Sequence, residues 1–281
     1  MPVLLERLKE GNSMNDELTQ DQRLTKLVED FKTDSGEYKD IETPGDTDGR
    51  RQILRSLMNI RMPRRISPET LRIQDAYLRE RAREKGIVKL EDIPAKEGAI
   101  SLWQGDITRL AVDAIVNAAN SQMLGCFVPM HTCIDNCIHT FAGVQLREEC
   151  DRQMKRLRAQ YGPDYEQPTA VPMLTDAYNL PAKKVIHIVG PIVSGCLTPA
   201  LERDLVSCYT RCMDLCTDNG LRTIAFCCIS TGVFHFPPER AAQIALKTVR
   251  RWLAEHDSAM DRVIFNVFSD KDRSIYEHLF Q

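Results

Sequence analysis

The chain has 281 residues, of which 43% are hydrophobic and 27% are charged, and its formal net charge is -3. This composition is typical of a globular protein, and the slightly acidic balance argues against a general nucleic-acid binder. No apolar run approaches the ~20 residues that span a bilayer, and Met1–Glu6 lacks the apolar core of a secretion signal. We therefore expect a cytoplasmic protein that binds no membrane and no specific nucleic acid. Its ten cysteines should be reduced thiols, small buried hydrophobic residues or metal ligands rather than a disulfide framework.

The first part of the chain differs in pattern from the rest. Residues 1–50 are polar and carry turn signals, so we expect them to be partly irregular. Apolar residues at helical spacing predict a short helix from Arg50 to Met62, which Pro63 ends. A serine N-cap and a first-turn proline predict a second helix from Pro68 to Lys85. Residues 1–95 are therefore interpreted as a helical N-terminal extension.

From residue 96 onward, strand-like runs alternate with helical segments. Strands are predicted at residues 100–104, 114–117, 170–175, 184–189, 223–229 and 263–268. Helices are predicted near residues 134–158, 200–219, 238–256 and 271–280. Such alternation is typical of an α/β sheet that helices cover on both faces.

A loop with two cysteines and a histidine follows the second of these strands. Cys126, His131 and Cys133 offer two thiolates and an imidazole, which can hold a zinc ion, and three protein ligands would leave one coordination position open. Cys137 would close the site if it were a fourth ligand. By spacing alone, buried cysteines beside a hydrogen-bonded histidine are a somewhat better interpretation than a metal site.

Polar groups also follow several of the predicted strands. Asp106 comes after the first strand, where its carboxylate could accept a hydrogen bond from an exocyclic amine such as that of adenine. Asn117 and Asn120 lie around the end of the second strand, and in open α/β sheets ligands bind beyond the carboxyl ends of strands. A turn and a satisfied loop backbone are the plain alternatives for these residues.

Two further features concern helix starts. The loop Ser230–Pro237 follows an apolar strand and precedes a helix, so its backbone N–H groups could bind an anion, although it could equally be a simple connection. Asp135 stands near the start of a long helix, where the helix dipole favours a carboxylate, and it could also orient a water or a sugar hydroxyl. His139 is expected to be a packed, hydrogen-bonded core residue.

Taken together, these segments resemble a macrodomain from about residue 96 to residue 281. The resemblance is carried by residues 105–108, 113–120, 185–191 and 229–234. The loop with Cys126, His131 and Cys133 replaces the glycine-rich run of ordinary macrodomains. It resembles the zinc-containing branch, the microbial protein-ADP-ribose hydrolases, and the segment from Arg50 to Ile93 resembles the extension of that branch. The resemblance implies a three-layer α/β/α fold with a mixed central sheet, preceded by the helical extension.

The resemblance also implies roles for particular residues. Asp106 would bind the adenine amine with Ile107 beside it, and Asn120 would hold the distal ribose. Asp135 matches the catalytic aspartate of related hydrolases. The metal ligands of one zinc ion would be Cys126, His131 and Cys133. The diphosphate would be wrapped by Ser230, Thr231, Gly232, Val233 and Phe234. His235 stands where many macrodomains have glycine.

The expected function is zinc-dependent removal of mono-ADP-ribose from modified proteins, with Asn120 and Asp135 as catalytic residues. Water would attack the anomeric carbon of the distal ribose, and ester-type linkages to aspartate or glutamate are the easier substrates. Expected partners are ADP-ribose and a mono-ADP-ribosylated protein. The alternative is a reader module that binds ADP-ribose without chemistry and in which zinc only braces the loop.

Overall fold

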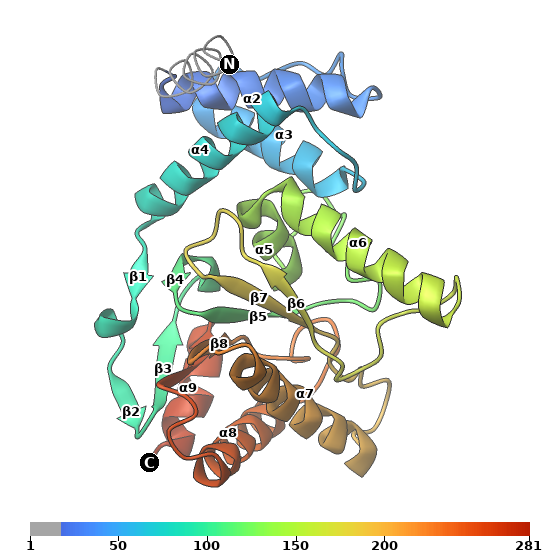
Figure 1. Cartoon of the computed structure of the whole chain (residues 1–281). Coiled ribbons are helices and arrows are strands. Elements are labelled where there is room, and N and C mark those ends of the chain that lie inside the picture. Colours follow the sequence, from blue (N-terminus) through green and yellow to red (C-terminus); the bar gives the residue numbers. More distant parts are fainter. Residues whose placement is uncertain (1–17) are drawn as a thin grey trace, which may run out of the picture.

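The structure is a computed structural model that describes residues 18–281, so the predictions for residues 1–17 lie outside it. A seven-stranded sheet forms its centre (Figure 1). In sheet order the strands are β2 (Ala95–Glu97), β3 (Ile100–Gln104), β9 (Arg262–Val267), β8 (Thr223–Phe226), β5 (Ala114–Ala118), β7 (Lys184–Ile188) and β6 (Met173–Asp176). The five inner strands are parallel, whereas β2 and β6 pair antiparallel at the two edges. The predicted mixed sheet is confirmed.

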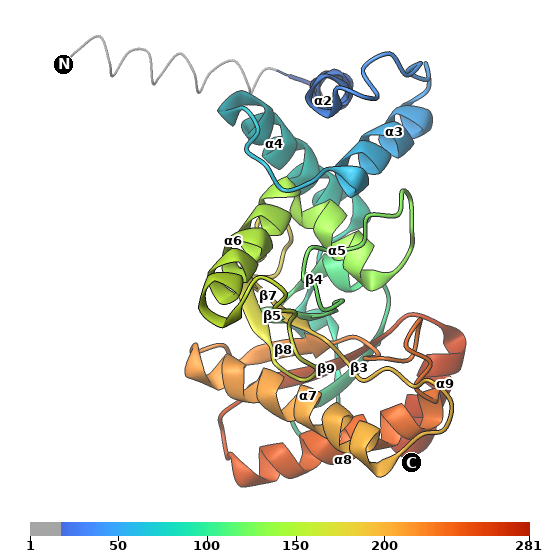
Figure 2. The same cartoon turned by 90° about the vertical axis from the view of Figure 1, so that its right-hand side faces the viewer.

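Helices cover both faces of this sheet. On one face lie α5 (Ile134–Ala142) and α6 (Val144–Tyr161), and on the other lie α7 (Pro199–Asp218), α8 (Pro238–Glu255) and α9 (Asp270–Leu279) (Figures 1 and 2). Every residue of β8 is buried, as expected for an inner parallel strand that is covered on both sides. The three-layer arrangement agrees with the sequence prediction.

The N-terminal extension is a separate helical layer beyond α5 and α6 (Figure 2). It consists of α2 (Gln20–Ser35), α3 (Thr47–Ile60) and α4 (Pro68–Lys85). Helix α2 was not predicted from the sequence. Its few apolar residues are separated by many polar ones, and the capping box at Thr19 was not recognised as a helix start. The buried hydrophobic residues of this layer are Leu24, Leu27, Val28, Phe31, Leu54, Leu57, Met58, Ile73, Tyr77 and Leu78, together with Val144 from α6.

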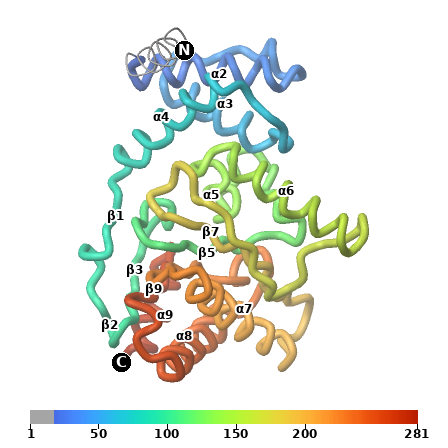
Figure 3. The backbone as a smooth tube through the Cα atoms, in the orientation of Figure 1, coloured from blue at the N-terminus to red at the C-terminus, as the bar shows by residue number. Residues whose placement is uncertain are grey.

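The chain passes from the extension to the sheet along one side of the molecule (Figure 3). It leaves α4, pairs β1 (Val88–Lys89) with β4 (Leu110–Ala111), forms a short 3-10 helix (Leu90–Asp92) and then enters β2 and β3. A second 3-10 helix (Ile107–Arg109) follows β3. The end of α4 therefore lies beside the carboxyl end of the first inner strand.

Some predicted boundaries were wrong. The helix expected over residues 134–158 is two helices, because Gly143 between them has a φ of 98°, a left-handed conformation that glycine tolerates. The strand predicted over residues 170–175 begins at Met173, and the one predicted over 223–229 ends at Phe226. Strand β2 was not predicted. Residues 170–172 and 227–229, which were predicted to belong to these strands, lie in loops instead.

Within residues 18–281, no helix is long and apolar enough to cross a membrane. All ten cysteines are free thiols in the structure.

Candidate active site

The candidate residues gather where the inner parallel strands end. Asp106 follows β3, Asn117 and Asn120 lie at the end of β5, and residues 229–236, here called the Ser230 loop, follow β8. Because these strands run in the same direction, their carboxyl ends form one edge of the sheet, which is where open α/β folds bind ligands. Phe268 follows β9 at the same edge and is 79% exposed.

Asp106 is partly engaged by its own turn and by the extension. Its Oδ1 accepts hydrogen bonds from the backbone N–H of Thr108 at 3.0 Å and from the Thr108 hydroxyl at 2.6 Å. Its Oδ2 accepts one from Lys85 Nζ, at the end of α4, at 3.1 Å. Burial acts to raise the pKa of Asp106, but the Thr108 hydrogen bond and the charge of Lys85 outweigh it and hold the pKa below its usual value. Asp106 is therefore ionised, and its Oδ2 can accept a further hydrogen bond.

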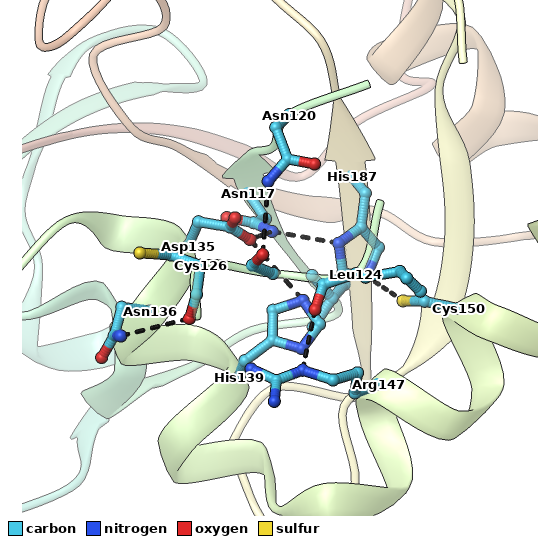
Figure 4. Close-up of polar contacts among 12 residues, drawn as sticks. Asn117, Asn120, Leu124, Cys126, Asp135, Asn136, His139, Arg147, Cys150 and His187 are labelled. Atoms are coloured by element: carbon cyan, nitrogen blue, oxygen red, sulfur yellow. Dashed lines mark hydrogen bonds and ion pairs between the residues drawn. The ribbon is translucent and has the colours of Figure 1, made fainter. Parts of the chain in front are cut away.

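A buried polar network lies beneath the end of β5 (Figure 4). The Asn117 side-chain amide donates to Asp135 Oδ1 at 2.8 Å and lies 3.0 Å from His187 Nδ1. His139 Nε2 is 3.6 Å from the same Asp135 oxygen. His139 is buried as predicted, but neither of its ring nitrogens has a hydrogen-bond partner within residues 18–281, so the prediction that it would be satisfied was wrong.

Burial controls the charges in this network. It raises the pKa of Asp135 to about 6, although the Asn117 hydrogen bond opposes the shift. It lowers the pKa of His187 to about 3. Burial also lowers the pKa of His139 well below its usual value, with smaller contributions from the charges of His187 and Arg147. Both imidazoles are therefore neutral near pH 7.

A second set of possible metal ligands lies in this network, since ligand atoms of His139, Cys150 and His187 lie within 4.8 Å of one another. Both ring nitrogens of His187 already have polar neighbours, Asn117 at 3.0 Å and Thr175 at 3.0 Å. We therefore assign no metal to this set.

The structure brings the three predicted zinc ligands together in residues 125–133, here called the Cys–His loop. The ligand atoms of Cys126, His131 and Cys133 lie within 4.8 Å of one another, and Cys126 Sγ is 3.4 Å from His131 Nδ1. Two thiols and an imidazole at such separations fit a tetrahedral zinc ion with three protein ligands. Cys137 does not belong to the cluster, and Arg55 Nη2 donates to its thiol at 3.7 Å.

Neighbouring residues fix both ends of the Cys–His loop. Asn120 donates from its amide to the carbonyl of Gly125 at 3.3 Å. Gly125 has a φ of 80°, and a Cβ there would lie 2.7 Å from the His139 ring, so only glycine fits. At the other end, the Cys133 thiol caps α5 by accepting a hydrogen bond from the backbone N–H of Asn136. Burial raises the pKa of the Cys133 thiol to about 12, and it outweighs this hydrogen bond, which acts to lower that pKa.

The Ser230 loop presents backbone donors to the sheet edge. Its two bends are at Ser230 and His235, whose φ values of 67° and 56° are left-handed. A glycine at position 235 would adopt that conformation without strain. Within residues 18–281, the N–H groups of Gly232, Val233 and Phe234 have no main-chain partner, and the buried Ser230 hydroxyl has no partner at all.

Two contributors to the site were not found by sequence reasoning. Arg147 of α6 is buried, donates to the carbonyl of Leu124 at 2.7 Å, and lies 4.3 Å from the ring of Phe127 in the Cys–His loop. Lys85 reaches Asp106 from the extension. Their positions depend on helices that meet only in the folded chain, so no local motif marks them.

The layered fold and its strand-edge site are those of a macrodomain. A protein-family model, the Macro domain, matches residues 116–245. A Trypanosoma brucei macrodomain in complex with ADP-ribose superposes with a TM-score of 0.62 at 31% sequence identity, over 81% of this chain and 95% of that one. An Oceanobacillus iheyensis macrodomain, solved with MES bound, gives a TM-score of 0.57 at 36% identity over 64% and 88%.

Curated relatives narrow the class further. A protein-ADP-ribose hydrolase of Treponema medium is 49% identical over 93% of this chain and 99% of its own length. One from Staphylococcus aureus (strain MRSA252) is 42% identical over 92% and 95%. The rat ADP-ribose glycohydrolase MACROD1 is 46% identical over 63% of each chain. The chain therefore belongs to the protein-ADP-ribose hydrolase family of macrodomains, and it is an enzyme.

Proposed function

We propose that the protein removes mono-ADP-ribose from modified side chains with the help of one zinc ion held by Cys126, His131 and Cys133. The observation that carries the zinc proposal is the convergence of these three ligand atoms within 4.8 Å. The cluster lies between Asn120, which donates to the carbonyl of Gly125, and Asp135, which is in the first turn of α5 and accepts a hydrogen bond from Asn117 of β5. A metal there would lie beside the reacting sugar.

ADP-ribose would lie along the carboxyl edge of the sheet. The free capacity of Asp106 Oδ2 suits the adenine amine, and Ile107 next to it is buried and closes that end. The unpaired N–H groups of the Ser230 loop suit the diphosphate, with Ser230, Thr231, Gly232, Val233 and Phe234 around it. Asn120 would hold the distal ribose over the buried network.

Asp135 would take a proton from the attacking water. Its Oδ1 accepts the Asn117 hydrogen bond, and no hydrogen bond within residues 18–281 engages Oδ2, which leaves that oxygen for a water. The water oxygen forms a bond to the anomeric carbon as the bond from that carbon to the side-chain oxygen breaks. One water proton passes to Asp135, and the electron pair leaves with the side-chain oxygen. General base help of this kind is typically worth ~100- to 10,000-fold.

A carboxylate is a stable leaving group that needs little protonation. We therefore propose ester linkages on aspartate or glutamate as the substrates. When bound, a zinc ion acts as a Lewis acid that polarises a sugar or leaving-group oxygen. Asn120 contributes by orientation, since it fixes the ribose relative to the water.

One experiment tests the role of the metal. A glutamate-linked mono-ADP-ribosylated protein is incubated with the wild type, with Cys126→Ala, with a chelator-treated sample, and with Cys196→Ala as the matched control, because Cys196 is an exposed free thiol outside the cluster. We expect release by the wild type and Cys196→Ala, and a loss of at least about 100-fold in the other two samples, because a metal ion that acts as a Lewis acid contributes several kcal/mol of transition-state stabilisation. Equal release from all four samples would remove zinc from the reaction. Binding of ADP-ribose without any release would favour the reader.

A serine-linked substrate of the same protein tests the linkage. We expect release from the glutamate ester and little from the serine ether, because a serine alkoxide is a much poorer leaving group than a carboxylate and needs protonation as the bond breaks. Equal rates on both would overturn the ester assignment.

A further inference from the structure

The Cys–His loop has little hydrophobic burial to hold it in place. None of residues 126–133 is buried, and the tip of the loop is strongly exposed, with Val128 at 56% and Met130 at 38%. Met130 also has a left-handed φ of 59°, a conformation that costs a non-glycine residue free energy. A loop of this kind keeps one geometry only if hydrogen bonds hold it.

Two of those hydrogen bonds come from the N-terminal extension. Arg55 of α3 donates from Nη2 to the carbonyl oxygen of His131 at 2.7 Å and to Asn136 Oδ1 at 3.0 Å. Asn59, one turn further along α3, accepts a hydrogen bond from the backbone N–H of the strained Met130 at 3.1 Å. Residues about 75 positions away in sequence therefore fix the backbone of one proposed ligand and of its neighbour.

Asn136 passes the effect of Arg55 to the two cysteines. Its side chain is fully buried and donates to the carbonyl oxygens of Val128 at 2.9 Å and Cys126 at 3.3 Å (Figure 4 shows the latter contact). Its backbone N–H donates to the Cys133 thiol at 3.4 Å. Because Arg55 donates to Oδ1, the amide is oriented with its NH₂ toward the loop. Arg55 therefore helps to position all three proposed ligands: His131 directly through its carbonyl oxygen, and Cys126 and Cys133 through Asn136.

We infer that Arg55 is a positioning residue for zinc, and that the helical extension completes the metal site of the adjoining macrodomain. The inference rests on the proposed function for the identity of the ion. Arg55 has no assigned contact with ADP-ribose, so it should affect metal binding and leave binding of the nucleotide unchanged. Partners of this outer kind typically change metal affinity by 10- to 100-fold.

The test compares Arg55→Met, Arg55→Lys and the matched control Arg72→Met in the full chain. Arg72 is an exposed arginine on α4 of the same extension. Zinc affinity is measured by competition with a chromophoric chelator, ADP-ribose affinity by calorimetry, and global stability by thermal unfolding. We expect Arg55→Met to weaken zinc binding by roughly 10- to 100-fold with ADP-ribose affinity unchanged. Arg55→Lys should recover part of the loss, and Arg72→Met should behave as the wild type.

Hydrogen exchange of residues 125–133 in the metal-free protein gives a second readout. Arg55→Met should speed exchange in this loop and leave the Ser230 loop unchanged. If the wild type binds no zinc, the metal part of the proposed function fails, and the exchange result alone then decides the role of Arg55. Wild-type zinc affinity in Arg55→Met would overturn the inference. So would equal losses of zinc affinity, ADP-ribose affinity and thermal stability, because they would indicate general unfolding.

Discussion

The Cys–His loop and the Ser230 loop follow β5 and β8, which are neighbours in the sheet, yet they are held in different ways. The Ser230 loop closes on its own backbone: the N–H of Phe236 donates to the carbonyl of Ser230 at 3.0 Å, and that of His235 to Gly232 at 3.0 Å. The Cys–His loop is held by side chains of other elements, among them Arg55 and Asn59 of the extension and Arg147 of α6, which lies over the ring of Phe127.

This difference separates two kinds of functional loop. The shape of a loop that closes on its own backbone depends mainly on a short stretch of sequence that suits its turns, provided that neighbouring segments leave room for it. A loop held from outside depends on the docking of remote helices, and its chemistry can be altered by a substitution far from the site. The predictions below test this division, beginning with the largest effect.

The Ser230 loop should be most sensitive to its contact with Gly190, which follows β7. A Cβ at position 190 would lie 2.1 Å from Ser230 Oγ and 2.8 Å from Ile229 Cγ2, so Gly190→Val must displace the loop. Overpacking of this kind costs about 1–3 kcal/mol, and we expect a loss of ADP-ribose affinity of roughly 10- to 100-fold by calorimetry. Gly45→Val is the control, because no atom lies within 4 Å of its added Cβ. Unchanged affinity in Gly190→Val would contradict the assigned diphosphate site.

Acid should loosen the Cys–His loop before the Ser230 loop. His139 packs against Gly125 of the Cys–His loop, and burial holds the pKa values of His139 and His187 below the ordinary 6.5, with His187 at about 3. Between these values the two imidazoles bind more protons in the unfolded chain than in the folded one, so the stability that they contribute above pH 6.5 is lost as the pH falls toward 3. The raised pKa of Asp135, about 6, acts in the opposite sense and offsets part of this loss. Between pH 7 and 4.5, the protection of amides from hydrogen exchange, relative to their intrinsic rate at each pH, should therefore fall first in residues 125–133.

A variant isolates the imidazole responsible for this pH dependence. His187→Gln cannot be protonated in this range, so its unfolding temperature should fall less between pH 7 and 4.5 than that of the wild type. His278→Gln is the control, because His278 is exposed. A pH dependence identical in wild type and His187→Gln would show that the buried imidazole is not its source.

The smallest effect is expected at His235. The left-handed conformation costs a non-glycine residue ~1–2 kcal/mol, and glycine loses ~0.5–1 kcal/mol more entropy on folding. His235→Gly should thus stabilise the protein by about 0.5 kcal/mol and raise the unfolding temperature by about 1–2 °C, with no change in ADP-ribose affinity. The same substitution at His278, inside α9, should lower the unfolding temperature instead, because glycine disfavours a helix. A destabilised His235→Gly would contradict this account of the turn.

The sequence predicted much of the fold because alternation of strands and helices is a local signal. It placed Asp106, Asn120 and the Ser230 loop correctly after inner strands, since parallel strands end at one edge. It missed the break at Gly143, where a single glycine inside a helical pattern decides the outcome. It also missed α2, whose apolar stripe is diluted by polar residues.

The contacts of Arg55, Lys85 and Arg147 could not have been predicted in the same way. Each of these cations joins segments that are distant in sequence, and arginine and lysine on helices are ordinarily solvent-facing. Their partners are backbone carbonyls and a strand-end carboxylate, which carry no motif. Only the docking of the extension on α5 and α6 defines them.

Val144, the first residue of α6, is buried among side chains of the extension. A shortened protein that began at residue 96 would expose this valine and leave α5 and α6 with an uncovered apolar face, which favours self-association. The extension and the macrodomain should therefore be expressed together. A protein shortened to the macrodomain would lose solubility and also the contacts that fix the geometry of the Cys–His loop.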